Sequence, residues 1–324
     1  MTSETAVAVR GLRMRYGTRD VLDGVEFEVR RGEVVCLLGP NGAGKTTTIE
    51  ILEGFRARSA GEVEVLGTDP ATGGEDWRAR TGVVLQSWRD HARWTARHLL
   101  RHLGAYYTPY STPARPRPYD VDELIEMVGL GEHADQKVRL LSGGQRRRLD
   151  VAIGIVGRPE LLFLDEPTAG FDPHARREFH ELVLRLAGAE ETTVLLTTHD
   201  LDEAEKLADR ILILADGRIV ADGTTAGLAE RFAGAARVSW RLDGERRSVT
   251  TPDATRFLRG LLAEHGEAVA DLEVRRPSLE DTYLALVRRH EAGASRGESA
   301  REFGAETGGR APGPGRIESG EAAR

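Results

Sequence analysis

Apolar and polar residues alternate in short runs over the first 65 residues of the chain. The runs Ala6–Val9, Val25–Val29 and Glu62–Val65 turn every second side chain to one face, as half-buried β-strands do. Turn sequences at Gly17 and Gly32 separate these runs. The pattern predicts an antiparallel sheet close to the N-terminus.

Four other short runs are rich in apolar and β-branched residues, and we predict strands there, three of them buried and the run from Thr81 a β-rich strand. They are Val34–Leu38, Thr81–Leu85, Leu161–Leu164 and Thr193–Thr198. Helical patterns lie between them, so the fold class that we predict is α/β, with the antiparallel sheet beside the central core.

Residues 87 to about 158 follow a different pattern, because their apolar residues recur at helical spacing. A proline-rich stretch at residues 108–118 interrupts the pattern, and no helix could cross it. We predict an α-helical subdomain inserted into the α/β core. Its apolar positions include Trp88, Trp94, Leu99, Leu100, Leu103, Tyr106, Val121, Leu124, Ile125 and Val128.

After the core, the pair Asp216 and Gly217 lies between the apolar runs Ile211–Ala215 and Arg218–Ala221, which is a strong hairpin signal. Residues 236–290 then predict a small C-terminal α/β domain.

In this small domain we expect strands at Val238–Leu242, Arg247–Thr250 and Ala268–Val274. Thr251 is predicted to cap the helix after the second strand, with Pro at its first position, and Ser278 to cap a last helix. Residues 291–324 hold too few large apolar residues to offset the entropy of folding, so we predict a disordered tail.

Composition narrows the classes of function. The 324 residues carry 45 Lys and Arg against 52 Asp and Glu, a net charge of −7, which does not favour nucleic acid as a partner. The arginine run 146–148 is interpreted as a solvated face. Cys36, the one cysteine, cannot form an internal disulfide, which suits a reducing cytosol, and we expect it to be a small residue of the core.

No apolar run approaches the roughly 18 residues of a spanning helix, and Met1–Thr5 lacks signal-peptide features, so a membrane role would need a partner.

The residues after Val34–Leu38 fit a phosphate-binding loop. Gly39 to Thr46 matches the pattern G-x-x-x-x-G-K-[ST] at every fixed position, with a strand before it and a helical pattern after it. The glycines let successive N–H groups point inward, and the following helix adds its positive end. Lys45 is expected to reach the β- and γ-phosphates, and the Thr46 hydroxyl to hold Mg²⁺.

Chemically active residues also follow the other predicted strands of the core. Gln86, the pair Asp165 and Glu166, and His199 each stand at a strand's carboxyl end. Because these ends meet at one edge of an α/β sheet, the side chains are expected to converge near the phosphate loop. Asp165 is then a candidate Mg²⁺ ligand, and Glu166 a candidate to orient or deprotonate an attacking water.

The pentapeptide Leu141–Gln145, Leu-Ser-Gly-Gly-Gln, precedes another helical pattern. Ser142 is well placed as the N-cap, and Gly143 and Gly144 allow close approach to the backbone. The sequence predicts a second helix start that faces a phosphate. Taken alone, the pentapeptide also fits an ordinary glycine turn into a helix.

Taken in order, these motifs resemble the ATP-binding cassette of ABC transporters from about residue 5 to 225. They correspond to the aromatic loop at Tyr16, Walker A at 39–46, the Q-loop at Gln86, the signature at 141–145, Walker B at 161–166, the D-loop around Asp172 and the switch histidine, His199. Phe171 departs from the leucine common in the D-loop but keeps a bulky apolar side chain.

Two other classes of protein are alternatives to a transporter subunit. One is a soluble ABC ATPase that acts on DNA or ribosomes, which usually has two cassettes or long insertions. The other is a P-loop kinase, which has no use for the signature.

The resemblance implies ATP and Mg²⁺ as cofactors and a head-to-tail pair of cassettes, with each ATP between one Walker A and the partner's signature. A homodimer is the simpler pairing, and a related cassette as partner stays open. The implied catalytic residues are Glu166, His199 and Gln86, and the implied Mg²⁺ ligands are Thr46, Gln86 and Asp165. Tyr16 either stacks on adenine or only packs in its strand. The implied nucleotide contacts are Tyr16, Gly39, Asn41, Gly42, Gly44, Lys45, Thr46, Thr47, Ser142, Gly143, Gly144 and Asp172.

The predicted organisation is a P-loop NTPase ABC cassette at 5–230, with its helical subdomain at about 87–158, the small domain at 236–290 and the tail at 291–324. Residues 277–284, Pro-Ser-Leu-Glu-Asp-Thr-Tyr-Leu, resemble the C-terminal domain of the daunorubicin/doxorubicin resistance type of exporter ATPase. The resemblance implies an ATP-hydrolysing subunit on the cytoplasmic face of the membrane that energises a separate integral membrane permease. Export of a drug or lipid-like compound rests on the short C-terminal match alone.

Overall fold

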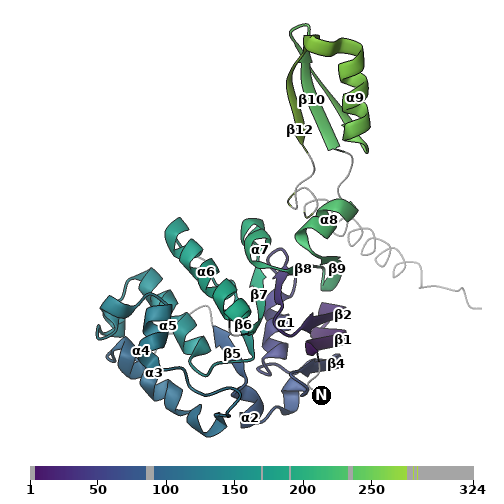
Figure 1. The fold of residues 1–324 in the computed structure, drawn as a ribbon. Helices are drawn as coiled ribbons and strands as arrows, with labels where there is room; N and C mark the ends of the chain where they lie inside the picture. The colour runs from purple at the N-terminus through teal and green to yellow at the C-terminus, as the bar shows by residue number, and fades with distance from the viewer. Residues whose placement is uncertain are drawn as a thin grey trace, which may run out of the picture.

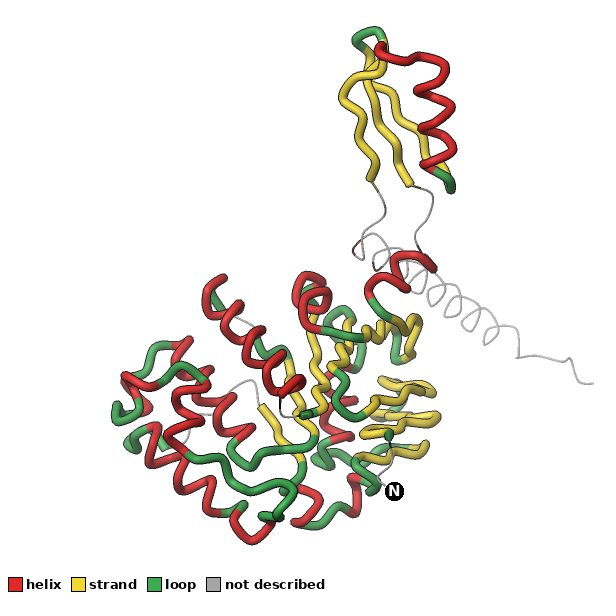
Figure 2. The backbone as a smooth tube through the Cα atoms, in the orientation of Figure 1, coloured by secondary structure: helices red, strands yellow, loops and turns green. Residues whose placement is uncertain are grey.

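Three β-sheets with helices beside them form the described part of the chain (Figures 1 and 2). The computed structural model describes residues 4–84, 91–168, 171–189, 191–232 and 236–275, together with 280 and 283. The predicted α/β fold class is confirmed. Gln86, Ser278 and the tail at 291–324 lie outside the described residues.

The largest sheet has six strands in the order β5-β6-β7-β3-β8-β9. Its first five strands run parallel, and β9 joins β8 through the predicted antiparallel hairpin, in which Asp216 and Gly217 have φ of 47° and 71°. The strands predicted as buried are confirmed, because β3 and β7 are buried at every position and β6 at every position except its last. β5 is buried at alternate positions. The strands are β5 (Thr81–Val84), β6 (Leu161–Asp165), β7 (Thr193–Thr198), β3 (Val34–Leu38), β8 (Arg210–Ala215) and β9 (Arg218–Gly223).

The predicted antiparallel sheet near the N-terminus has the order β2-β1-β4. Its strands are β1 (Thr5–Tyr16), β2 (Arg19–Arg30) and β4 (Ala60–Val65). Leu12 and Leu22 of this sheet are buried in one apolar cluster with residues of α1 (Lys45–Leu52), the helix after the phosphate loop. The sheet thereby supports the loop from one side.

The segment between β5 and β6 is largely helical, as predicted. It contains α3 (Ala96–Ala105), α4 (Val121–Met127) and α5 (Gly143–Ile155), and a single turn of 3₁₀ helix stands at Thr108–Tyr110 in the proline-rich stretch. The apolar residues of the three α-helices form one core with the adjoining face of the large sheet. The same segment holds the short helices η3 (Gly131–His133) and η4 (Val138–Leu140), and the short helices elsewhere are η1 (Pro70–Thr72), α2 (Glu75–Arg78) and α8 (Thr225–Phe232).

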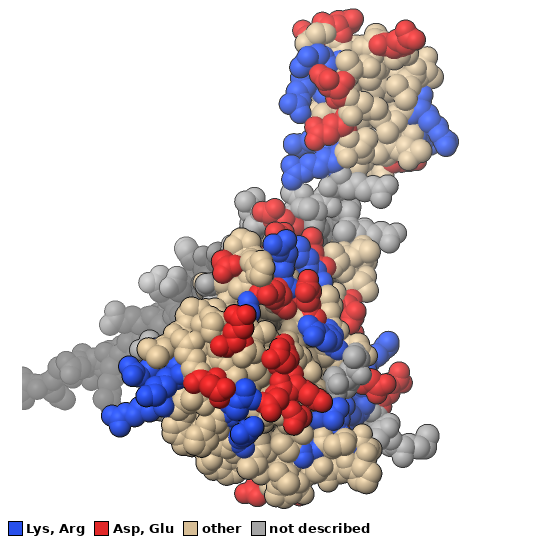
Figure 3. All heavy atoms as spheres, turned by 60° about the vertical axis from the view of Figure 1, so that its left-hand side comes forward, with Lys and Arg blue, Asp and Glu red and all other residues tan. Residues whose placement is uncertain are grey.

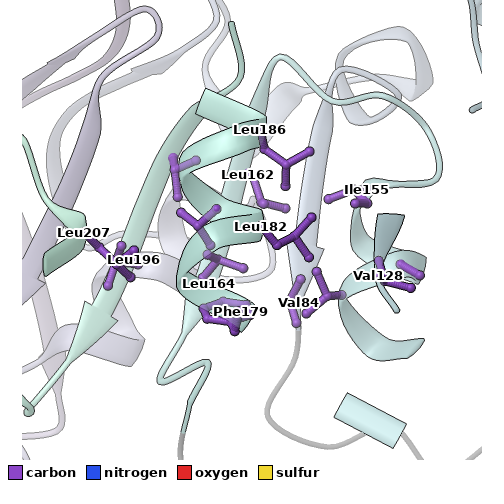
Figure 4. Close-up of a cluster of buried hydrophobic side chains, with 14 of the residues drawn as sticks. Val84, Val128, Ile155, Leu162, Leu164, Phe179, Leu182, Leu186, Leu196 and Leu207 are labelled. Carbon is purple, nitrogen blue, oxygen red and sulfur yellow. The ribbon is translucent and has the colours of Figure 1, made fainter. Parts of the chain in front are cut away.

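Two further helices cover the same face of the large sheet. α6 (Pro173–Ala189) and α7 (Leu201–Leu207) follow β6 and β7 in the chain. Figure 4 shows Phe179, Leu182 and Leu186 of α6 directed at strand residues, among them Leu162 and Leu164 of β6. This packing fixes α6 against the strand that ends in Asp165 and Glu166.

The third sheet belongs to the C-terminal segment and has the order β11-β10-β12. Its elements are β10 (Ala236–Leu242), β11 (Glu245–Thr251), α9 (Ala254–His265), η5 (Gly266–Ala268) and β12 (Val269–Arg275). Val238, Trp240, Leu242 and Leu261 form an apolar cluster separate from the two clusters of the large sheet.

The predicted cap of α9 is wrong by two residues. Asp253, not Thr251, is the N-cap, and its Oδ1 accepts a hydrogen bond of 2.9 Å from the N–H of Arg256. The Thr251 hydroxyl instead accepts the N–H of Asp253 at 3.3 Å. The Thr251 hydroxyl is therefore engaged in a side-chain turn before the helix, although the sequence pattern predicted it as the cap.

Acidic and basic side chains are interspersed on the face of the molecule shown in Figure 3. Glu160, the residue before β6, contacts Arg31, Arg80 and Arg117 at 3.0, 2.8 and 3.4 Å. Burial alone would raise the pKa of Glu160, but hydrogen bonds from Arg80 and Arg31 lower it to about 2.

Among the described helices, none is long and apolar enough to cross a bilayer.

Candidate active site

The phosphate loop leads from the end of β3 into α1. Gly42 and Gly44 have φ of 81° and 106°, a region that favours glycine. A Cβ atom on Gly44 would lie 2.6 Å from Cδ2 of Leu22, and one on Gly39 would lie 2.4 Å from the carbonyl oxygen of Leu214. The loop is therefore held tightly against β2 and β8, and these two positions have room only for glycine.

Lys45 is buried at the first position of α1. Its Nζ donates hydrogen bonds to the carbonyl oxygens of Gly39 at 2.8 Å and Pro40 at 3.3 Å. The same nitrogen lies 3.5 Å from Oε1 of Glu166. The loop thus holds a positive charge among its own carbonyl groups, beside the carboxylate from β6.

Thr46 and Asp165, the neighbours of Lys45 and Glu166 in the sequence, provide two oxygen atoms to the site. The Thr46 hydroxyl donates to Oδ2 of Asp165 at 3.1 Å, and the Thr197 hydroxyl donates to Oδ1 of Asp165 at 2.5 Å. Hydroxyl and carboxylate oxygens are the donors that Mg²⁺ takes in proteins, so this pair fits the expected metal.

Glu166 stands in a left-handed backbone conformation with φ of 45°. Its N–H donates to the Thr197 hydroxyl at 3.1 Å, which ties the turn after β6 to the end of β7. Its Oε1 lies 3.3 Å from Nδ1 of His199 as well as close to Lys45. The ends of β3, β6 and β7 therefore bring these three side chains together, and Gln86 is the one strand-end residue outside the described part of the chain.

A pocket of about 310 Å³ opens at the phosphate loop. Tyr16 lies at this pocket with its side chain 42% exposed, and the guanidinium carbon of Arg56 is 5.3 Å from the centre of its ring. Arg19 and Val21, which the sequence analysis did not single out, also line it. Their position depends on how the β1–β2 hairpin folds over the loop, and no motif signals it. The lining residues are Tyr16, Arg19, Val21, Asn41, Gly42, Gly44, Lys45, Thr46, Thr47 and Glu166.

The signature forms the start of α5, as predicted. The Ser142 hydroxyl accepts the N–H of Gln145 at 3.3 Å, and Oε1 of Gln145 accepts the N–H of Ser142 at 2.9 Å, a complete capping box. A Cβ atom added to Gly143 or Gly144 would meet no described atom within 4 Å. None of the signature residues lines the phosphate-loop pocket.

Asp172 also lies outside that pocket and caps α6. Its Oδ1 accepts the N–H groups of His174 at 2.8 Å and Ala175 at 3.0 Å. The bond from Ala175, followed by that from His174, lowers the pKa of Asp172.

The interpretation of the arginine run 146–148 as a solvated face is wrong for Arg147. This side chain is 8% exposed, and its Nε donates to the carbonyl oxygen of Pro167 at 2.9 Å. Burial lowers the pKa of Arg147. Arg148, by contrast, forms an ion pair with Glu178 of α6. The helix that begins at the signature is thus bonded to the turn after Glu166.

The comparisons with known proteins agree with this geometry. The family profile described as ABC transporter matches residues 22–169. Daunorubicin resistance ATP-binding protein DrrA3 of Streptomyces coeruleorubidus is 37% identical over 308 residues, which covers 88% of this chain and 96% of that protein. This chain belongs to the ABC transporter family. It is the ATP-binding, ATP-hydrolysing subunit type of that family.

Other relatives extend the comparison. Nod factor export ATP-binding protein I of Ralstonia nicotianae is 42% identical over 221 residues, 68% of each chain. Among solved structures, an ATP-binding subunit of an ABC transporter is 28% identical with a TM-score of 0.61, covering 70% of this chain and 93% of that one. An ABC transporter cassette in its ADP conformation is 25% identical with a TM-score of 0.59, covering 68% and 91%.

Proposed function

We propose that two copies of this chain pair head to tail, so that each ATP lies between the phosphate loop of one copy and the signature of the other. One observation carries the proposal. Lys45 and Thr46 line the pocket, whereas Gly143 and Gly144 face open space outside it. A helix start without side chains in front of its N–H groups can bind a phosphate that a second copy presents.

In the proposed reaction, Glu166 accepts a proton from the water that attacks the γ-phosphorus, and the bond from that phosphorus to the β-phosphate oxygen breaks. The products are ADP and phosphate. Lys45 moves its Nζ from the carbonyls of Gly39 and Pro40 to the β- and γ-phosphates, where negative charge develops. His199 contacts the γ-phosphate and, through its 3.3 Å contact, orients Glu166.

Thr46 and Asp165 are the proposed Mg²⁺ ligands, and Gln86 is the proposed third. Mg²⁺ would neutralise charge on the β- and γ-phosphates. The Thr46 hydroxyl can keep its hydrogen bond of 3.1 Å to Asp165, because a hydroxyl that donates its proton still has lone pairs for the cation. Thr197 keeps its bond to the other oxygen of Asp165 and holds that carboxylate in place.

We further propose that residues 5–230 act as one ATPase cassette and that residues 236–290 form a separate small domain. The independent apolar cluster around Trp240 supports this division. The cassette performs work because ATP favours the closed pair and ADP the open one.

A groove of about 480 Å³ supports a permease as the partner of the cassette. It lies between the residues after α1 and β5 on one side and α3 and α5 on the other. Phe55 and Tyr106 line it and are 70% and 64% exposed. Contiguous exposed apolar surface, which these side chains form with the other apolar residues of the groove, marks interaction sites. An amphipathic cytoplasmic segment of the permease is the proposed occupant.

The groove also holds ionisable groups. Glu53, Asp150 and Arg78 line it. Burial, with smaller contributions from Asp165 and Glu50, raises the pKa of Glu53 to about 8, and burial raises the pKa of Asp150. A basic side chain among the apolar residues of the permease segment would stabilise both carboxylates in their charged form.

The direction of transport that we propose is export. Relatives that match over most of their length are named for daunorubicin resistance and for Nod factor export, so a drug or lipid-like compound is the proposed class of substrate. The chain would then be bound peripherally at the cytoplasmic face of the membrane through its permease.

A mixing experiment tests the head-to-tail pairing. Lys45→Ala and Ser142→Arg chains are each expected to be inactive, because each removes one half of both sites. A mixed pair keeps one intact site, formed by the phosphate loop of the Ser142→Arg chain and the signature of the Lys45→Ala chain. An equal mixture should regain about a quarter of the wild-type turnover, since about half of the pairs are mixed. A mixture that stays as inactive as its components would refute the pairing.

A further inference from the structure

An ion pair and a histidine–carboxylate contact join the helix that follows the D-loop to the helix that follows the switch histidine, His199. Nη1 of Arg176 on α6 lies 2.9 Å from Oδ2 of Asp200, the N-cap of α7. One turn further along α6, Nε2 of His180 lies 3.8 Å from Oε1 of Glu203 on α7. Figure 1 shows α6 and α7 as neighbouring helices above the large sheet. We call these two pairs the α6–α7 ladder.

The two pairs of the ladder differ in burial. The side chains of Arg176 and Asp200 are 36% and 31% exposed, whereas those of His180 and Glu203 are 9% and 1% exposed. Nε2 of His180 and Oε1 of Glu203 are buried without a hydrogen-bond partner among the described residues. Apolar side chains of similar size would stabilise this contact at least as well, so stability alone does not explain the inner pair.

Glu203 also lies close to the other elements of the active site. Its charge acts on the Cys36 thiol of β3, the strand that leads into the phosphate loop. It acts likewise on Arg147 of α5, the helix that begins at the signature. Lys45 also acts on Cys36, and Asp150 and Asp165 also act on Arg147. The inner pair therefore stands where the helices from the signature, the D-loop and the switch histidine meet.

Each helix of the ladder begins at a capping aspartate next to a functional loop. Asp172 caps α6 at the D-loop. Asp200 caps α7 directly after His199, because its Oδ1 accepts the N–H groups of Asp202 and Glu203 while its Oδ2 binds Arg176. A shift of α6 is thereby passed to the residue beside His199.

We propose that the α6–α7 ladder sets the position of His199 relative to the D-loop, so that Arg176, His180 and Glu203 are positioning residues for ATP hydrolysis. The ladder rests on the proposed function in the role given there to His199, which contacts the γ-phosphate and orients Glu166. Its residues do not line the phosphate-loop pocket, so they act through His199 and not on the nucleotide.

Removing one pair should leave ATP binding intact and misplace His199. We expect Arg176→Gln, His180→Gln and Glu203→Gln each to lower kcat about tenfold, the scale of a small misplacement in an active site. KM for ATP should change by less than about twofold, because the lost interaction matters only in the transition state. The double variant His180→Gln/Glu203→Gln should be no slower than the slower single variant, since both remove one contact.

The controls separate positioning from folding. Arg176→Lys keeps the charge and should recover most of kcat, and Arg185→Gln, at an exposed position further along α6, should behave as wild type. Melting temperatures identify any variant that fails to fold. If the variants of one pair fail to fold, kcat of the variants of the other pair tests the proposal.

Unchanged kcat in both His180→Gln and Glu203→Gln would overturn the proposal. So would an equal loss of kcat in Arg176→Lys and Arg176→Gln. In the Glu166→Gln background, ATP-dependent association should survive Glu203→Gln; its loss there would mean that the ladder acts on pairing and not on His199. If Glu166→Gln alone does not associate, the proposed pairing fails, and the kinetic test of the ladder still stands.

Discussion

Nζ of Lys45 and Oε1 of Glu166 lie 3.5 Å apart at the phosphate loop. The residues are far apart in the sequence and meet because β3 and β6 end at the same edge of the large sheet. A phosphate group entering the loop competes with this carboxylate for the ammonium group. We therefore expect nucleotide binding to release Glu166 from Lys45 and to leave it available to the attacking water.

The first prediction concerns Glu166→Gln. Loss of the proposed base should lower turnover by about 10² to 10⁴, the usual contribution of general base catalysis. ATP affinity should stay the same or rise slightly, because an anion that competes for Lys45 is removed. Phosphate release and titration with a fluorescent ATP analogue measure the two quantities. Near-normal turnover would remove Glu166 from its role.

Gly143→Ala distinguishes an effect on the stability of one chain from an effect on the proposed contact between two chains. An added Cβ atom meets nothing within 4 Å in the described structure, so the melting temperature should stay close to that of the wild type. The methyl group would stand where the phosphate of the partner's ATP is proposed to bind. ATP-dependent association should weaken at least about tenfold, or 1.4 kcal/mol. Unchanged association together with unchanged turnover would argue against a composite site.

Glu160 predicts how stability depends on pH. Its pKa is lowered from an ordinary 4.5 to about 2, so the unfolded chain binds its proton more readily than the folded chain. The stabilisation is complete above pH 4.5 and is lost as the pH falls towards 2. Glu160→Gln should lower the free energy of unfolding at pH 7 by about 3 kcal/mol, since it leaves the buried Arg117 without its carboxylate.

Urea unfolding at a series of pH values measures this effect. The difference between wild type and Glu160→Gln should shrink between pH 4.5 and 2. A difference that stays constant across this range would show that the ion pairs of Glu160 are not its cause.

Phe55 tests the proposed permease groove. Phe55→Asp places a charge among the apolar lining residues, which is unfavourable for an apolar partner segment. Coexpressed with its permease, the variant should leave the membrane fraction on sedimentation, while the wild-type chain remains there. Leu184→Asp is the matched control, because Leu184 is also exposed, at 48%, but lies on α6 outside the groove. Equal retention of all three chains would exclude Phe55 from the contact.

The sequence predicted the convergence of Lys45, Asp165 and His199 because it depends on local patterns alone. Buried runs identify parallel strands, and the residues that follow them share one edge of the sheet. The capping box at Ser142 was equally accessible, since its partners are three residues apart.

Other features depend on contacts between distant segments, which periodicity does not report. Arg147 looks like a surface arginine until Pro167 accepts its hydrogen bond. Arg19 joins the pocket only through the register of the β1–β2 hairpin. The pair His180 and Glu203 joins two helices whose relative position is set by packing on the large sheet. Thr251 was misassigned because a local turn competes with the helix cap for its hydroxyl.

Light scattering on purified Glu166→Gln protein, with and without Mg·ATP, tests the central claim most directly. The composite-site account predicts a monomer without nucleotide and a dimer with Mg·ATP, because the variant binds ATP but does not hydrolyse it to reopen the pair. A chain that binds ATP and remains a monomer would contradict self-pairing.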